Sequence, residues 1–402
     1  MKLSIQWAAR WIAAATLCLG FTACSDDNTG DGSGGGESTL NPALTEILTQ
    51  YVNSTVVPTY ERLADASIVL QDACDALYLH KDNGTATQQD VEAACQAWLD
   101  ARKWWEYSEA FLLGPATVKG IDPHIDSWPL DKTQLDALLS SPAIMAQMDA
   151  DYITSNYGSG GVCGFHALEY IIFADGADKS VQLITADEAK YAAAVAGDLA
   201  AQCVFLEAAW RGQANITDPV KIALLGEDGV DADTDNWGAQ FIQAGQAGSR
   251  YRTQMEAIVD FIKADKGCYG IANEVGDTKI SDPVNSGNVL DVESWFSFNS
   301  KTDFQDNIRG IQNVIMGGVS DLRDESKSVY NLLQENNPTL AGELKDCIET
   351  CIGEDGTTGL GTIIYPFRDH LKPEENEEAI RSCQALRDKL MEVANYLQEN
   401  DF

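Results

Sequence analysis

The stretch from Val91 to Trp105, VEAACQAWLDARKWW, decides the fold class of this chain. Residues spaced three and four apart fall on one face of an α-helix, and here nearly all of them are apolar. The predicted buried face consists of Val91, Ala94, Cys95, Trp98, Arg102 and Trp105. Other segments share this period, and none alternates as a half-buried strand would. The other segments with the helical period are residues 42–78 with a break at Pro58, 186–210, 237–264, 302–316, 321–335 and 374–399. The sequence therefore predicts an all-α fold.

The length of the chain and one loop-like segment indicate how the helices are divided. A chain of 402 residues is longer than a single hydrophobic core usually organises, so two domains are expected. Residues 214–236 are rich in Gly and Asp, which is typical of a boundary or a long surface loop. We therefore expect two helical-bundle domains, residues 42–215 and residues 216–402.

Residues 1–23 have the pattern of a secretory signal peptide. Two basic residues precede an uncharged, largely apolar run at residues 11–23, which is too short to span a bilayer. Cys24 follows a string that is similar to the lipobox of bacterial lipoproteins. We therefore expect a lipidated Cys24, with a flexible tether over residues 24–41. This predicts an outer-membrane lipoprotein of the cell envelope, facing the periplasm or the cell surface. An ordinary cleaved signal peptide is the alternative, and it also predicts export.

Cysteines recur in a similar pattern in the two halves. In each half, a helix that carries Cys precedes a helix that reads Cys-Gln-Ala and then an apolar residue, which favours an internal duplication. An even number of cysteines in an exported chain favours disulfides. We expect Cys74 to pair with Cys95, and either Cys347 or Cys351 to pair with Cys383. Buried thiols are the alternative for all of these.

The chain is strongly acidic, with 62 Asp and Glu against 27 Lys and Arg and a formal net charge of −35. This charge disfavours nucleic acid and anionic lipid surfaces as partners, so contact with the membrane is expected through the lipid anchor only. It favours cations and cationic solutes as ligands. A plainly solvated surface would have the same composition.

The most informative string for chemistry is GGVCGFHALEYIIF at residues 160–173. Its strongly polar groups, His166 and Glu169, are three residues apart and therefore share one helix face. An imidazole and a carboxylate at this spacing supply two metal ligands in di-iron helix bundles, and the pair suits iron, zinc or manganese. The alternative is a buried pair that satisfies its own hydrogen bonds. Glycines before the pair indicate that the helix begins there, beside a closely packed neighbour.

The order Gly164-x-His166-x-x-Glu169 resembles the signature of imelysin-like proteins. This family includes presumed peptidases, iron-regulated proteins and a periplasmic component of an iron-uptake system. Further similar segments lie at residues 101–115, 125–129 and 297–311. The resemblance implies two helical bundles with a functional site where they meet, and it favours His166 and Glu169 as metal ligands.

Other residues are expected to complete that site. Glu109 is expected as a third metal ligand, because an unpaired carboxylate in an apolar stretch is costly to bury. Arg102 lies seven residues earlier on the same face and is expected to hold a carboxylate, although an exposed ion pair would fit the pattern too. Gly164, Ser297 and Asp303 complete the ligand-binding candidates. We interpret Asp126 as a turn residue before Trp128-Pro129 and not as part of the site.

These residues favour a binding role over an enzymatic one. We expect a metal ion, iron or zinc, or a small ligand to bind at the domain junction, in iron uptake with a transport partner in the envelope. A metal-dependent peptidase with Glu169 as ligand or base is the alternative. However, zinc peptidases with His-x-x-Glu-His have a second His where Tyr170 stands here. A structural or adhesive surface lipoprotein is the second alternative.

Overall fold

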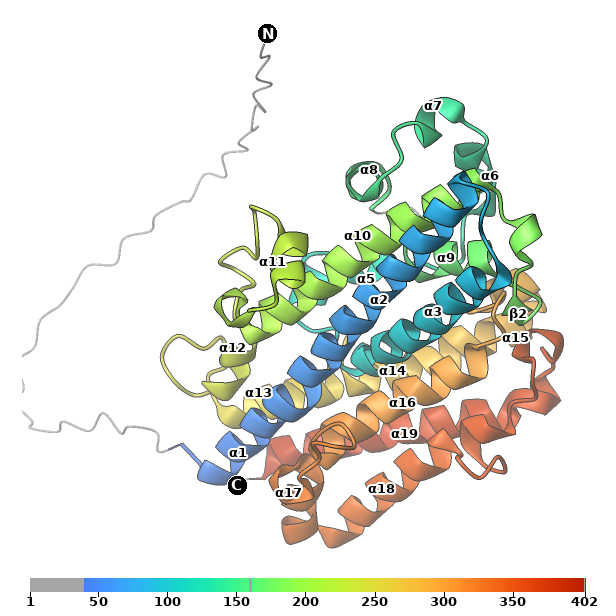
Figure 1. Ribbon diagram of the computed structural model, residues 1–402. Coiled ribbons are helices and arrows are strands. Elements are labelled where there is room, and N and C mark those ends of the chain that lie inside the picture. Colours follow the sequence, from blue (N-terminus) through green and yellow to red (C-terminus); the bar gives the residue numbers. More distant parts are fainter. Residues whose placement is uncertain (1–39, 159–160, 401) are drawn as a thin grey trace, which may run out of the picture. The chain divides into compact units, whose positions relative to one another are not determined.

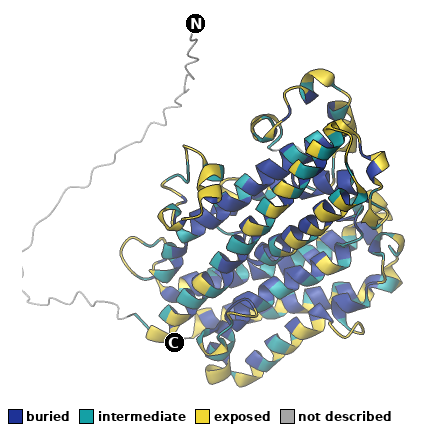
Figure 2. Ribbon diagram, in the orientation of Figure 1, coloured by how far each residue is buried: buried dark blue, intermediate teal, exposed yellow. Residues whose placement is uncertain are grey.

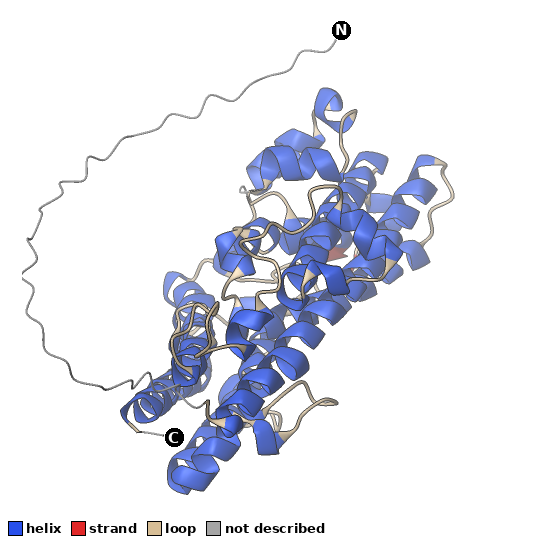
Figure 3. Ribbon diagram, turned by 90° about the vertical axis from the view of Figure 1, so that its left-hand side faces the viewer, coloured by secondary structure: helices blue, strands red, loops and turns tan. Residues whose placement is uncertain are grey.

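In a computed structural model, nearly all regular structure is helical, which confirms the predicted all-α class (Figure 1). The structure describes residues 40–158, 161–400 and 402. Within these ranges, the strands are one antiparallel pair of two residues each, β1 (Phe173–Ala174) and β2 (Ala177–Asp178) (Figure 3). The expected signal peptide, the lipidated Cys24 and most of the tether lie outside the described residues.

The helices of the first half of the chain are α1 Pro42–Gln50, η1 Tyr51–Val56, α2 Val57–Asp82, α3 Gln88–Ser108, η2 Glu109–Phe111, α4 Pro115–Val118, α5 Ile121–Ile125, α6 Lys132–Leu139, α7 Pro142–Met145, α8 Ala150–Tyr157, α9 Gly164–Ile172, η3 Val181–Leu183, α10 Ala186–Arg211 and η4 Gln213–Asn215. Those of the second half are α11 Pro219–Leu225, α12 Gly238–Ile242, α13 Gln254–Lys263, α14 Cys268–Asn273, η5 Glu274–Ser281, α15 Asp282–Ser286, η6 Val289–Asp291, α16 Ser300–Met316, η7 Glu325–Lys327, α17 Val329–Asn336, α18 Pro338–Ile352, η8 Gly359–Thr362, η9 Phe367–Asp369 and α19 Pro373–Glu399.

Helix α3 has the buried face that its sequence predicts. Its first turn is fixed by a capping box, in which Thr87 and Asp90 satisfy each other's backbone N–H groups. All the residues of the predicted face are buried, and they pack against α2, α9 and α16 (Figure 2). This face includes the charged Arg102, whose burial requires partners from neighbouring elements.

The expected break at Pro58 is wrong, because the helical path continues through it. Residues Tyr51–Val56 form a π-helix, η1, and Pro58 stands in the first turn of α2 directly afterwards. Proline lacks a backbone N–H, and the change of hydrogen-bond pattern just before it accommodates that loss without ending the helix.

Helix α10 forms the core of the first half. It packs against α2, α8 and α9, and most of its apolar residues are buried. Within the described residues, it is the one helix long and apolar enough to cross a membrane, but its most apolar window is 83% buried in the fold. The hydrophobicity of α10 is therefore accounted for by packing.

The two halves of the chain contact each other extensively. Helix α16 lies against α3, and α14 lies against η2, so residues 40–402 form one compact unit. The domain boundary near residue 215 and the internal duplication stay predictions. The packing of α16 on α3 brings polar residues of both halves into one buried region.

The cysteines that we expect to form disulfides are thiols in the structure, so their pairing stays a prediction. Cys74 and Cys95 are both buried thiols, and the Cys95 thiol donates a hydrogen bond to the carbonyl oxygen of Ile172 at 3.4 Å. The sulfurs of Cys351 and Cys383 lie 3.6 Å apart as thiols. Of the two expected partners for Cys383, the structure therefore places Cys351 beside it.

Candidate metal centre

The start of α9 lies in close contact with the end of α5. Gly164 has a φ of +75°, and a Cβ atom at this position would lie 2.0 Å from the carbonyl oxygen of Ile125. Glycine avoids both the backbone strain and the clash. Because Asp126 follows Ile125 and His166 lies in the first turn of α9, this contact brings a carboxylate and an imidazole together.

His166 is completely buried and faces three carboxylates. Its Nδ1 lies 3.1 Å from Glu169 Oε2, and its Nε2 lies 3.2 Å from Asp126 Oδ1 and 3.8 Å from Glu293 Oε1. Nε2 makes no hydrogen bond of suitable geometry to any described residue. One ligand atom each from Asp126, His166 and Glu293 lie within 4.8 Å of one another, and these three residues form the candidate metal-binding triad.

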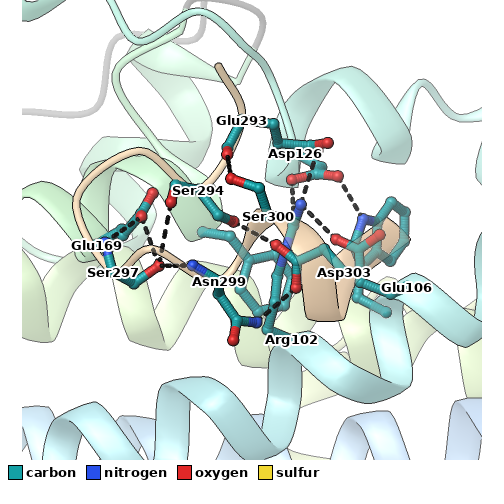
Figure 4. A network of polar contacts seen from close by, with 12 residues as sticks. Arg102, Glu106, Asp126, Glu169, Glu293, Ser294, Ser297, Asn299, Ser300 and Asp303 are labelled. Atoms are coloured by element: carbon teal, nitrogen blue, oxygen red, sulfur yellow. Dashed lines mark hydrogen bonds and ion pairs between the residues drawn. The ribbon is translucent and has the colours of Figure 1, made fainter. Parts of the chain in front are cut away.

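Arg102 lies at the centre of the network that surrounds this triad (Figure 4). Its buried guanidinium contacts Asp126 and Glu106, lies 2.8 Å from Glu293 Oε1 and lies 3.7 Å from Asp303 Oδ2. The planar group has donors in a fixed geometry, so it orients several carboxylates at once. A side chain of α3 thereby joins groups from α5, from the loop after η6 and from α16.

Glu169 holds the loop that carries Glu293. Its Oε1 accepts hydrogen bonds from the backbone N–H of Phe296 at 3.0 Å, the N–H of Ser297 at 2.8 Å and the Ser297 hydroxyl at 2.7 Å. Figure 4 shows Glu169 beside Ser297. Its other oxygen faces His166 Nδ1. A carboxylate behind a histidine fixes the orientation of the ring, as the partners of metal-bound histidines do. Glu169 is therefore a positioning residue for both His166 and the loop.

A second cluster adjoins the triad through Glu293. The Lys279 ammonium of η5 lies 2.8 Å from Glu109 Oε2 and 3.1 Å from Glu293 Oε2. The Asn307 side-chain amide of α16 donates to both Glu106 and Glu109 at 2.6 Å. Glu109 therefore belongs to this second cluster, and Glu293 is shared between the two.

Buried acids outnumber buried bases in the combined network. Its basic side chains with a permanent charge are Arg102 and Lys279. Its buried carboxyl groups are Glu106, Glu109, Asp126, Glu169, Glu293 and Asp303. Unpaired buried charge is strongly destabilising. The network therefore requires further positive charge, either as protons or as a bound cation.

The pKa shifts indicate where protons supply that charge. Burial raises the pKa of Glu109 to about 8 and that of Asp303 to about 7, against the attraction of nearby Lys279 and Arg102. Burial opposes the charged imidazole, but the facing carboxylates raise the pKa of His166 to about 10. Asp126 and Glu293 behave differently: burial opposes their charge, yet the neighbouring cations and His166 lower both pKa values, that of Glu293 to about 2.

A small cavity opens beside the triad. Its volume is about 140 Å³, and Asp126 and Glu293 are in its wall. The remaining lining residues are Glu109, Asp122, Trp128, Glu274, Thr278, Lys279 and Asp291. Because the lining is mostly acidic, the cavity attracts cations and repels anions.

The structure brings most of the predicted site residues into one network. His166, Glu169 and Arg102 lie together as predicted from their helices, and Ser297 and Asp303 reach them from the second half of the chain. Gly164 contributes through the backbone contact with Ile125. Glu109 lies in the adjoining Lys279 cluster, and the candidate triad includes neither Glu109 nor Glu169, which we predicted as metal ligands beside His166.

Several residues of the network were missed by the sequence argument. Asp126, which we favoured as a turn residue, ends α5 and faces His166; its Oδ2 also accepts a hydrogen bond from the Trp105 indole at 2.6 Å. Glu106, four residues after Arg102, had a usable signal, because this spacing places an acid beside a base on a helix. Glu293 and Lys279 lie in stretches without a periodic pattern, and only the tertiary structure brings them together.

The fold and the site together define an all-helical protein with a buried, acid-rich site that both halves of the chain build. The family model for imelysin matches residues 56–393, so the chain belongs to the imelysin family. It is 26% identical over 334 residues to iron-regulated protein A of Synechococcus elongatus, a match that covers 83% of this chain and 80% of that protein.

Solved structures agree with this family. The crystal structure of a protein designated iron-regulated protein A precursor, from Parabacteroides distasonis, is similar with a TM-score of 0.74 and 26% identity, covering 89% of this chain and 96% of the other. An imelysin-like protein from Psychrobacter arcticum has a TM-score of 0.56 at 16% identity, covering 88% and 93%, and supports the fold alone.

Proposed function

We propose that this protein binds a divalent metal cation at Asp126, His166 and Glu293, and that iron is its physiological metal. The observation that carries the proposal is a buried imidazole nitrogen without a hydrogen-bond partner among the described residues, facing two carboxylate oxygens within 4.8 Å. When bound, the cation supplies the positive charge that the surrounding acids require.

The remaining residues of the network hold this donor set in place. Arg102 orients Asp126 and Glu293, and Glu169 orients the imidazole while tying down the loop that carries Glu293. One imidazole and two carboxylates suit iron, manganese and zinc by ligand type. Two similar proteins, from Synechococcus elongatus and Parabacteroides distasonis, are named iron-regulated protein A and iron-regulated protein A precursor, and these names favour iron among the three metals.

We further propose a place for this binding in iron acquisition at the cell envelope, with a transport partner that receives the metal. The proposal draws on the sequence pattern of residues 1–24, which predicts a secreted, lipid-anchored chain. Metabolic labelling with an alkyne fatty acid tests the anchor. Incorporation that a Cys24→Ala variant abolishes is expected, and equal incorporation in that variant would contradict lipidation at Cys24.

Metal binding is tested by calorimetric titration of the purified protein with Fe(II) under anaerobic conditions and with Zn(II). We expect one saturable site, whose affinity for the metal falls at least about tenfold after His166→Ala or Asp126→Asn. His80→Ala is the matched control, because His80 also pairs with an acid but lies on α2 and is partly exposed. Unchanged affinity in the His166 and Asp126 variants would refute the assignment, and so would equal loss in His80→Ala.

The peptidase alternative gains no support from the geometry of this site. Pockets that enclose drug-sized ligands measure roughly 300–1,000 Å³, whereas the cavity beside the triad measures about 140 Å³. Cleavage of casein that a chelator and Glu169→Gln both abolish would favour the peptidase over the binding role.

A further inference from the structure

Lys279 is a buried cation whose ion-pair partners all come from other elements. Its ammonium lies close to three carboxylates: 2.8 Å from Glu109 Oε2, 3.1 Å from Glu293 Oε2 and 3.7 Å from Glu106 Oε2. These acids belong to η2, to the loop after η6 and to α3. A metal ion also requires several oxygens that converge on one positive charge in this way.

Two of these carboxylates, those of Glu106 and Glu293, are incompletely satisfied, and of these two Glu293 lines the cavity. The Glu293 side chain is 7% exposed, and its Oε2 accepts no hydrogen bond of suitable geometry from any described residue, although the ammonium is close. The same side chain lines the acidic cavity and is a member of the candidate triad. Glu293 therefore pairs with Lys279, lines the cavity and lies near His166.

The cavity limits what can reach Glu293. A volume of about 140 Å³ has room for a small number of water molecules. A small cation with part of its hydration shell fits this space, whereas a bulky metal chelate does not. The acidic lining likewise favours a free cation over an anionic complex.

We propose that Lys279 is an internal counter-ion, which stabilises the Glu109 and Glu293 carboxylates until a small hydrated divalent cation enters through the cavity and displaces it. This inference rests on the proposed function, because it assigns the class of ligand and the way in which the same site is filled. Like charges repel at such short range in a poorly hydrated site, so the ammonium and the cation compete for Glu293.

The displaced ammonium has a nearby partner. Glu274 lies on the same π-helix as Lys279, lines the cavity and attracts the ammonium electrostatically. Rotation of the Lys279 side chain toward Glu274 keeps the ammonium paired, and it frees Glu293 for the incoming cation. Glu109, which the ammonium also leaves, keeps its hydrogen bond from Asn307 and lines the cavity that the cation enters.

The test is a calorimetric titration of Lys279→Met with Zn(II), beside the parent protein at the same ionic strength. Methionine keeps an unbranched side chain, one atom shorter than that of lysine, and removes its charge, so we expect binding at least about tenfold tighter than in the parent. Lys279→Arg keeps the charge and is expected to bind no more tightly than the parent. Lys266→Met is the matched control for net charge, because Lys266 pairs with Asp122 of the cavity wall at 2.8 Å.

The outcomes separate this inference from the proposed function. If the parent binds Zn(II) through His166 while Lys279→Met binds equally or more weakly, the counter-ion role is wrong and the metal site stands. Equal tightening in Lys266→Met would also overturn it, because net charge alone would then explain the effect. If only Lys279→Met binds, the ammonium excludes the cation instead of being displaced by it, so both the inference and the proposed function fail; both also fail if neither protein binds.

Two further measurements check that the variant is folded and test the size of the ligand. Circular dichroism checks that Lys279→Met is folded, and Lys279→Gln, which can still donate a hydrogen bond, replaces it if it is not. A ferric trihydroxamate chelate serves as the bulky probe. We expect no saturable binding of this chelate to the parent, and saturable binding that depends on His166 would overturn the assignment of a small hydrated cation.

Discussion

Replacing Gly164 with alanine tests whether the glycine of the signature builds the site through backbone contact. The variant must adopt a φ of +75°, which costs an L-residue about 1–2 kcal/mol. Its Cβ would also lie 2.0 Å from the Ile125 carbonyl oxygen, and relieving such overpacking typically costs about 1–3 kcal/mol more. We therefore expect the free energy of unfolding to fall by about 2–5 kcal/mol.

Gly84 supplies a matched control. It has the same φ of +75°, but a Cβ atom there would meet nothing within 4 Å. Gly84→Ala therefore isolates the backbone strain, and we expect it to lower the free energy of unfolding by about 1–2 kcal/mol. The difference between the two variants measures the contact between α5 and α9.

Urea denaturation and Zn(II) calorimetry form the assay. Gly164→Ala is expected to bind Zn(II) at least about tenfold more weakly, because relief of the clash separates Asp126 from His166, whereas Gly84→Ala keeps the parent affinity. Equal losses of stability in the two variants, or full metal affinity in Gly164→Ala, would refute the argument that this glycine positions the site.

Three further predictions concern the surrounding structure. Glu169→Gln is expected to lower the free energy of unfolding in urea by about 1–3 kcal/mol, since its carboxylate accepts three hydrogen bonds from the loop; unchanged stability would contradict this. Burial raises the pKa of Asp306 to about 6, above its unfolded value, so its ionisation destabilises the fold progressively between about pH 4 and pH 6. Asp306→Asn should therefore gain stability relative to the parent by up to about 3 kcal/mol between pH 4 and pH 7, and a constant difference would argue against it. Oxidation is expected to link Cys351 to Cys383 and to raise stability by about 3–4 kcal/mol; peptide mapping that finds both still as thiols would exclude this bond.

The sequence predicted the helices well because their apolar residues recur with the helical period. The face of α3 from Val91 to Trp105 is buried as expected. The continuation of the helix through Pro58 was not predictable, because a π-helix absorbs the missing N–H without any distinct sequence pattern. A single residue such as proline is therefore a weaker indicator of where a helix ends than an apolar period that is sustained over several turns.

The candidate site was predictable only where its residues share a helix. His166 and Glu169 are three residues apart, so their proximity follows from helix geometry alone. Asp126, Lys279 and Glu293 come from a helix end, a π-helix and an irregular loop. Their meeting depends on the packing of α16 against α3 and on the close contact at Gly164, neither of which leaves a local pattern.

Crystals of the protein grown with Zn(II) or Mn(II) allow the most direct test, because anomalous scattering locates a bound metal without reference to any variant. The proposed site predicts an anomalous peak within bonding distance of His166 Nε2 and of carboxylate oxygens of Asp126 and Glu293, with the Lys279 ammonium moved away from Glu293. A map without a peak at these three side chains, in crystals that bind the same metal elsewhere, would contradict it.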